Sequence, residues 1–206
     1  LIINELKHKK YKRVVQTMSY APHFISTVVL VSMLTVFLDP STGIINKLFG
    51  MIGMGPFKFM SSSGLFAGVY VVSDIWQHVG WNAVIYLAAL AGIDYELHEA
   101  AMMDGASRLR RIWHINLPGI LPTIAILLIL QTGNLMSVGF EKVFLMQNPL
   151  NLESSEIIST FVYKMGLQYR QYSYSTAIGL FNSVVNLILL VSVNFCAKKV
   201  SGFGLW

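Results

Sequence analysis

Four long runs of apolar residues, almost free of charged side chains, constrain the fold of this chain more than any other feature. They cover residues 14–38, 65–93, 117–137 and 173–197. A hydrocarbon core about 30 Å thick is crossed by about 20 helical residues. Because lipid offers no hydrogen-bond partners, the backbone of such a run must satisfy its polar groups within a helix. The sequence therefore predicts an all-α membrane protein, a helical bundle with four spans in this stretch of chain.

Charge and cysteine content agree with a membrane protein. Only 12% of the residues are charged, against about 25% in soluble domains. The net charge of +5 comes from basic residues beside the apolar runs, which predicts contact with membrane lipid and argues against a nucleic-acid partner. The single cysteine, Cys196, excludes an intramolecular disulfide and any multi-cysteine metal site.

Prolines and a turn cluster shape these apolar runs. Pro22 interrupts the first run and is expected to kink its helix. Pro118 and Pro122 stand in the first turns of the third span, where proline is tolerated because those amides lack intrahelical partners. Residues 39–43 form a turn cluster, and the stretch from there to residue 63 is expected to be re-entrant or interfacial.

The distribution of Lys and Arg predicts the orientation in the membrane. Ten of the 15 basic residues lie in the N-terminal tail, in a polar island at 94–116, or at the C-terminal end. Cytoplasmic loops carry the excess of Lys and Arg in membrane proteins. Both ends of the chain and the polar island are therefore expected on the cytoplasmic side of the cell membrane, which agrees with an even number of spans.

The polar island at 94–116 has the local signals of two short helices. Asp94 is a candidate helix N-cap, and Glu96 and Glu99 in the first turns oppose the positive helix end. Gly105 tolerates left-handed backbone angles, so the chain can bend there. Small residues around Gly105 allow a helix to approach a partner surface closely, and three nearby arginines can reach acidic groups on a partner or lipid phosphates.

The island also carries a motif: Glu99-Ala100-Ala101, then Gly105, then Ile115-x-Leu117-Pro118. This pattern resembles the cytoplasmic coupling loop of binding-protein-dependent ABC transporter permeases, whose short helices dock into a groove on an ATPase subunit. The resemblance implies an inner-membrane permease of an ABC importer. It assigns ATPase coupling to Glu99, Ala100, Ala101, Asp104, Gly105, Ala106, Ile115, Leu117 and Pro118.

The resemblance extends over most of the chain. The stretches at 13–17, 20–26, 74–76, 80–81 and 139–150 look like the oligosaccharide and polysaccharide importer branch of these permeases. This favours a sugar over methionine or metal ions. Members of the branch have six spans, which implies that one or two spans are missing before Leu1 from a single permease domain covering residues 1–206.

The same resemblance implies the partners. Such permeases work as pairs, usually heterodimers, with two ATPase subunits and an extracytoplasmic solute-binding protein. No lysine here is followed by Ser or Thr, so the chain lacks the phosphate-binding loop that would bind ATP. ATP and Mg are thus assigned to the ATPase, and the chain itself is expected to be no enzyme and to hold no cofactor. Its five histidines show no metal-ligand spacing.

Polar residues within the second run form a candidate solute pathway. Asp74, Gln77, His78 and Trp81 fall at i, i+3, i+4 and i+7, on one helical face. Polar groups inside spans indicate function by default, and an aromatic ring beside hydroxyl-binding groups suits a sugar. The alternative is that Asp74 pairs with a residue on a neighbouring helix or lies at the outer interface.

Two asparagines on the other spans are further pathway candidates. Asn134 lies near the outer end of the third span, and Asn182 marks one face of the last span. Amide side chains at such positions also serve helix packing, and that reading stays open for both.

Two other functions remain open at this point. The same fold can import peptides or amino acids, and a channel or secondary carrier with an incidental loop is the rival from a different class. An ion-coupled carrier usually keeps several ionisable groups in its spans. Asp74 is the only acidic residue inside a predicted span, which disfavours the carrier.

Overall fold

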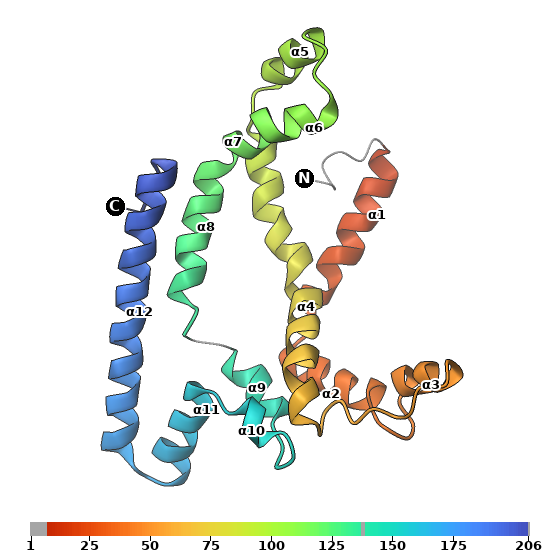
Figure 1. The fold of residues 1–206 in the computed structure, drawn as a ribbon, viewed down its shortest axis with the longest axis vertical. Helices are drawn as coiled ribbons and strands as arrows, with labels where there is room; N and C mark the ends of the chain where they lie inside the picture. Colours follow the sequence, from red (N-terminus) through yellow and green to blue (C-terminus); the bar gives the residue numbers. More distant parts are fainter. Residues whose placement is uncertain (1–7, 137–138, 206) are drawn as a thin grey trace. The chain divides into compact units, whose positions relative to one another are not determined.

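The computed structural model describes residues 8–136 and 139–205, and within these ranges it contains helices and no β-strand (Figure 1). The predicted all-α fold class is confirmed. Backbone contacts divide the chain into two compact units. The first unit comprises Leu1–Ala21, His78–Met136 and Ser183–Trp206, and the second unit comprises Pro22–Gln77 and Ser137–Asn182.

Two long helices contribute to both units. Helix α4 spans Ser63–Ala91 and helix α12 spans Tyr172–Ser201. With 29 and 30 residues, each is about 45 Å long at 1.5 Å per residue. Both are therefore long enough to cross a hydrocarbon core of about 30 Å.

Length and hydropathy together are more selective than length alone. In the described part of the chain, one helix, Tyr172–Lys199, is both long enough and apolar enough to cross a membrane. Two pairs of bent helices pass the same test together, so the number rises to three if each pair is one span. Helix α4 is not among them, because Asp74, Gln77 and His78 near its middle lower its hydropathy. The number of four spans stays a prediction.

The first apolar run is not the single kinked helix that Pro22 predicted. Helix α1 (Lys9–Tyr20) ends before a 3₁₀ turn (Ala21–Phe24) that contains buried Pro22. Helix α2 (Thr27–Phe37) then starts anew at Ser26, whose hydroxyl accepts a hydrogen bond from the amide of Val29. Two residues, Ile25 and Ser26, separate the 3₁₀ turn from α2.

The third apolar run is also interrupted. Pro118 lies in the first turn of α7 (Leu117–Gly119), and Pro122 lies in the first turn of α8 (Leu121–Gly133). The two prolines therefore start separate helices, and the direction changes by 59° between the segments ending at Gly119 and beginning at Leu121.

The second unit is built around one apolar cluster. Val31 of α2, Phe66 of α4, and Val143 and Met146 of α9 are almost fully buried against one another. The remaining helical segments of this unit are short. They are α3 (Ile44–Met51), α9 (Phe140–Met146), α10 (Leu152–Ser155), α11 (Ile158–Tyr163) and a π-helical turn (Lys164–Gln168).

Buried asparagines hold the irregular parts of the second unit. The Asn46 amide donates to the carbonyls of Leu38, Asp39 and Phe57 and accepts from the amide of Phe57. Asn151, fully buried, donates to the carbonyls of Met60 and Met146. These side chains replace the hydrogen bonds that a regular helix would supply.

Glycines set the helix contacts of the first unit, which also holds α5 (Tyr95–Met103) and α6 (Arg108–Arg111). A Cβ at Gly80 of α4 would overlap the backbone of Ser19 in α1. A Cβ at Gly119 would lie 2.7 Å from the side chain of Ile93. Small residues allow this close approach, as at other membrane helix interfaces.

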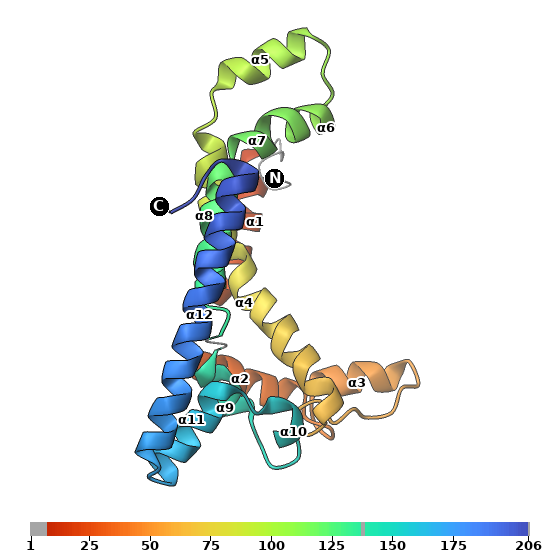
Figure 2. The same ribbon diagram turned by 60° about the vertical axis from the view of Figure 1, so that its left-hand side comes forward.

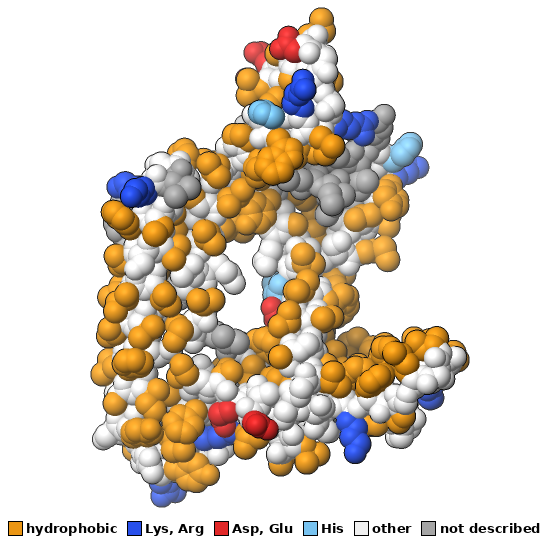
Figure 3. Space-filling model, viewed as in Figure 1, with side chains coloured by type: hydrophobic (Ala, Val, Ile, Leu, Met, Phe, Trp, Pro, Cys, Tyr) orange, Lys and Arg blue, Asp and Glu red, His pale blue; other side chains and the backbone are white. Residues whose placement is uncertain are grey.

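Apolar side chains cover much of the surface (Figure 3), including α12 along its length. None of the apolar window of α12 is buried within the chain. Such a surface needs lipid or partner subunits around it.

Substituting Gly80 with alanine is expected to destabilise the first unit by about 1–3 kcal/mol, as overpacking does. The melting midpoint of the detergent-purified protein should fall accordingly. Gly68→Ala on the same helix is the matched control, because a Cβ there meets nothing within 4 Å. Equal midpoints for the two variants would contradict the close contact of α1 with α4.

Candidate functional site: the polar segment at 94–118 and the polar face of α4

The polar segment begins with a capped helix. Asp94 accepts a hydrogen bond from the amide of Glu96 at 2.9 Å, which confirms it as the N-cap of α5. The helix lasts nine residues and ends where the Asp104 amide donates to the carbonyl of Ala100. The segment therefore starts as a short, locally stabilised helix.

Gly105 makes the bend that the sequence predicts. Its φ is +73°, in the left-handed region that favours glycine. The amide of Ala106 then donates to the carbonyl of Ala101 and closes the turn. Ser107 caps α6, and Figure 2 shows α5 and α6 as two separate helices joined by this bend.

The segment presents apolar as well as polar groups to its surroundings. Glu99, Ala100 and Asp104 are exposed, whereas Ala101 and Ala106 are half-buried. Met103 has 89% of its surface exposed. Its neighbours in the segment with more than two fifths of their surface exposed are Tyr95, Leu97, Met102, Leu109 and Trp113.

The sequence analysis did not predict a functional role for these large apolar residues. Methionine and leucine are common throughout this chain, so they carry little signal by themselves. Their position inside the one strongly polar island was the signal that was available. A polar segment that exposes a cluster of large apolar side chains is typical of a protein–protein contact.

The second half of the motif forms the base of the segment. Ile115 lies in a π-helical turn (Ile112–Asn116), and Leu117 and Pro118 begin α7. Asn116 between them is almost fully buried, and Gly119 lies against Ile93, two residues after the end of α4. Ile115 and Leu117 are half-buried, so they anchor the segment, and only Pro118 of these three is exposed.

On the polar face of α4, Asp74 has a partner from another helix. Its Oδ1 lies 3.2 Å from Nζ of Lys142 in α9. The Lys142 side chain is 5% exposed, that of Asp74 is 44% exposed, and the ammonium also lies 4.9 Å from the centre of the Tyr70 ring. The pairing alternative raised from sequence is therefore what the structure contains.

Gln77 belongs to the same unit and is also engaged. It is buried, and its Nε2 donates to the carbonyl of Ile25 at 2.9 Å. His78 is half-buried and Trp81 is 43% exposed, and both belong to the first unit. The four residues share a helix, but Asp74 and Gln77 are tied to contacts in the second unit.

The two asparagines outside α4 lie in different surroundings. Asn134 is exposed at the end of α8, and its Nδ2 donates to the carbonyl of Leu130, 3.3 Å away in its own helix. Asn182 of α12 is half-buried and lines a cavity of about 300 Å³ in the second unit. Of the two, Asn182 is therefore the one that lines a pocket of the described residues.

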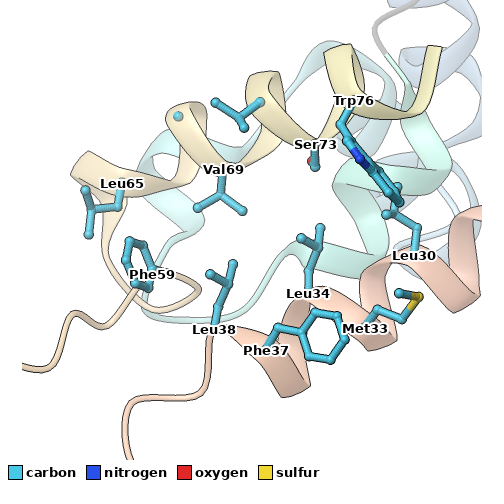
Figure 4. Close-up of a pocket in the computed structure, with 12 residues that line it drawn as sticks. Leu30, Met33, Leu34, Phe37, Leu38, Phe59, Leu65, Val69, Ser73 and Trp76 are labelled. Atoms are coloured by element: carbon cyan, nitrogen blue, oxygen red, sulfur yellow. The ribbon is translucent and has the colours of Figure 1, made fainter. Parts of the chain in front are cut away.

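A larger cavity of about 540 Å³ lies between α2 and α4 (Figure 4). Leu34 and Phe37 line it from α2, and Val69 and Trp76 line it from α4. Among the described residues of its lining, Ser73 is the one with a side-chain hydroxyl. This hydroxyl donates to the carbonyl of Tyr70, so the cavity offers a sugar little hydrogen bonding.

The carboxylate of Glu156, just before α11, is bonded to two side chains that follow it in sequence. Glu156 accepts hydrogen bonds from Lys164 at 2.7 Å and from the buried Thr160 hydroxyl at 2.6 Å. Partial burial, the largest influence, raises the pKa of Glu156, but these hydrogen bonds and the Lys164 charge outweigh it and hold the pKa below 4.5.

Residues 1–202 match the family described as "Binding-protein-dependent transport system inner membrane component". The chain therefore belongs to this family of membrane permease components, as its motif predicted.

Curated and solved relatives agree with this membership. The chain is 47% identical over its whole length to Protein LplB of Bacillus subtilis (strain 168) and 44% identical to the polygalacturonan/rhamnogalacturonan transport system permease protein YteP of the same strain. It spans 65% and 64% of their lengths. A solved bacterial alginate ABC transporter, in complex with an alginate pentasaccharide-bound periplasmic protein, is similar with a TM-score of 0.96 and 39% identity, over 99% of this chain and 71% of that one.

The ion pair between Asp74 and Lys142 predicts that removing either charge lowers the stability of the fold by a different amount. Asp74→Asn should destabilise the protein by about 3–5 kcal/mol, because it leaves a buried ammonium without its carboxylate. Lys142→Met should cost less, since the Asp74 side chain is 44% exposed. The double variant should recover most of the loss. Melting midpoints in detergent measure all three, and equal losses in the single variants would contradict the asymmetry.

The lowered pKa of Glu156 predicts a pH-dependent contribution to stability. Ionised Glu156 stabilises the fold above its usual pKa of 4.5, and this contribution is lost as the pH falls through the lowered value. The gap in melting midpoint between the wild type and Glu156→Gln should therefore shrink on acidification. Glu153→Gln, an exposed glutamate nearby, is the control, and a gap independent of pH would refute the prediction.

Proposed function

We propose that this chain is the membrane-spanning permease subunit of an ATP-driven importer of oligosaccharides. The observation that carries the proposal is the segment of α5, Gly105 and α6, which exposes Met103 and its apolar neighbours at the position of the family's coupling motif. In this proposal the segment at 94–116 is a cytoplasmic loop that docks on an ATPase subunit.

The packing of this segment supports a role in transmitting motion. Its first helix follows α4 directly, and its base packs Gly119 against Ile93. A push on α5 therefore reaches α4 and α8 through a packed base rather than a loose linker. Closure of an ATPase dimer would move both helices together and open or shut the solute pathway between permease subunits.

The partners belong to the same proposal. A second permease subunit completes the pathway, two ATPase subunits bind ATP and Mg, and an extracytoplasmic solute-binding protein delivers the solute. Both ends of the chain lie on the cytoplasmic side, residues 1–206 form one permease domain, and the whole protein has six spans. The exposed apolar surface of α12 supports contact with lipid or a second permease.

The substrate class rests on relatives and on the polar face of α4. One relative is named for polygalacturonan and rhamnogalacturonan, and the solved transporter for alginate. We assign the pathway to Asp74, Gln77, His78, Trp81, Asn134 and Asn182. Within it, half-exposed Asp74 can contact solute, whereas Gln77, bonded to the carbonyl of Ile25, positions α4 against the turn that precedes α2.

Gly105→Asp is expected to abolish ATP-driven uptake and the recovery of the ATPase in a mild-detergent pull-down, while membrane insertion is unchanged. The reason is that φ of +73° strains any residue with a side chain and disturbs the bend that presents α5. Gly53→Asp is the matched control, because Gly53 has φ +77° and equal open space outside this segment.

The pull-down also separates the rival functions. An ATPase and a second permease that co-purify with the wild type and with Gly53→Asp, but lose the ATPase with Gly105→Asp, would support the proposal. A protein recovered alone in all three cases would favour a channel or carrier. If the intact complex took up oligopeptides instead of oligosaccharides, the proposal of an importer would stand and the proposal of a sugar substrate would be wrong.

A further inference from the structure

The larger cavity, between α2 and α4 of the second unit, is a long apolar groove (Figure 4). Its lining on α4 runs from Leu65 to Trp76, eleven positions along the helix, which is about 16 Å at 1.5 Å per residue. Half of a hydrocarbon core of about 30 Å is about 15 Å. The groove is therefore about as long as the hydrocarbon of one membrane leaflet is deep.

The lining of this groove suits hydrocarbon. Apart from Ser73, the described lining residues are large apolar residues and one glycine. The groove is open to its surroundings, because Phe37, Val72 and Trp76 in its lining keep 44%, 68% and 47% of their surface exposed. Apolar surface of this kind marks a contact with membrane or protein.

Two lysines are brought together beside the groove by a buried amide. The Asn46 side chain donates to the carbonyls of Leu38 and Phe57, and it accepts from the amide of Phe57 at 2.8 Å. Lys47 follows Asn46, and Lys58 follows Phe57. These bonds place the backbones of the two lysines close together, although the lysines are eleven positions apart in sequence.

The same contacts join the lysines to the groove. Leu38, whose carbonyl accepts from Asn46, lines the groove, and so does Phe59, the residue after Lys58. Figure 4 shows Leu38 and Phe59 next to each other, at the end of the groove away from Trp76. The pair of cations thus lies at one end of an apolar groove.

The fold supplies no counter-ion for these two cations. Both lysines are exposed, and neither makes an ion pair with a residue in the ranges 8–136 and 139–205. The other lysines of the second unit, Lys142 and Lys164, are paired with carboxylates. Asp39, the one acidic residue in 38–73, accepts instead from Ser41 and Thr42 in its own turn. The two lysines are therefore open to an anion from outside the chain.

Helix α3, which carries the first of these lysines, also presents an apolar face. Ile44, Leu48 and Met51 fall at i, i+4 and i+7 and keep more than half of their surface exposed. Hydrophobic side chains gather along one side of α3 in Figure 3. An apolar face beside lysines is typical of a helix that lies among lipid headgroups.

We propose that the groove is a binding site for one anionic phospholipid, with an acyl chain between α2 and α4 and the phosphate at Lys47 and Lys58. A phospholipid carries a hydrocarbon chain and an anion in one molecule, so it satisfies both parts of the site. Free phosphate would leave the groove bare, and a lipid without net charge would leave the lysines without a counter-ion. The proposal rests on the family's place in the membrane and not on the sugar assignment.

Gly68 provides a reporter position in the groove. It lines the groove from α4, and a Cβ there meets nothing within 4 Å. With the native cysteine removed by Cys196→Ser, Gly68→Cys places a single thiol in the groove. Gly179→Cys is the matched control, because Gly179 has equal open space in a long helix outside this groove.

The test uses the protein purified in mild detergent with the subunits that stay bound, washed until free of phospholipid. Labelling of this chain by N-ethylmaleimide is followed by mass spectrometry, with phosphatidylglycerol or phosphatidylcholine of identical acyl chains added. Phosphatidylglycerol should halve the labelling rate of Gly68→Cys at a concentration at least tenfold lower than phosphatidylcholine. The rate for Gly179→Cys should stay within twofold.

The lysines are tested in the same assay. Lys47→Ser combined with Lys58→Ser should reduce the preference for phosphatidylglycerol to less than twofold and leave protection by phosphatidylcholine unchanged. Lys47→Arg combined with Lys58→Arg should keep the tenfold preference, because it keeps both charges. A general loss of structure would change the response to both lipids.

The remaining outcomes would overturn the site. Equal protection by the two lipids, with both lysines present, would remove the anionic headgroup. Slow labelling of the lipid-free protein would mean that a protein segment or a second permease fills the groove. Fast labelling at every lipid concentration would mean that no lipid enters it. Protection by a galacturonan trisaccharide would assign the lysines to a soluble anion instead. None of these results bears on the importer, which uptake and the pull-down test separately.

Discussion

Every buried polar group in a membrane helix bundle needs a partner, because lipid supplies none, and the second unit is organised around this constraint. Asn46 and Asn151 bond to irregular backbone that no helix could satisfy. Lys142, almost fully buried, draws α9 to α4 through Asp74 and the Tyr70 ring. These polar contacts, together with one small apolar cluster, hold short helices that propensity alone would not stabilise.

The same constraint distinguishes residues that build the fold from those that are open to a ligand. Gln77 and Lys142 are polar but have partners in the chain, so they position helices. The buried side-chain oxygen of Asn182 has no such partner among the described residues, and other atoms of this residue line a pocket. A polar residue in an apolar run therefore has no single meaning, and its hydrogen bonds decide which of the two roles is supported.

The polar segment at 94–118 follows a different logic, because it is stabilised by local signals. A cap at Asp94, a left-handed glycine at 105 and a second cap at Ser107 define its two helices without help from distant residues. Tertiary contacts enter only at its base, where Gly119 meets Ile93. Because α5 and α6 are stabilised locally and are anchored by the contact of Gly119 with Ile93, the segment can keep its shape while it docks on a partner and moves.

The order of residues alone was sufficient for the all-helical class, the capped and bent segment at 94–118 and the family, because hydropathy, caps and glycine angles act over a few neighbouring residues. It was not sufficient for the breaks at Pro22 and Ile120, for the partner of Asp74, or for the cavity beside Asn182. The ion pair and the cavity each depend on side chains many residues apart in sequence, such as Asp74 and Lys142. Only the folded chain brings such residues within bonding distance. A sequence pattern gives the separation of two residues along the chain, but not their distance in space.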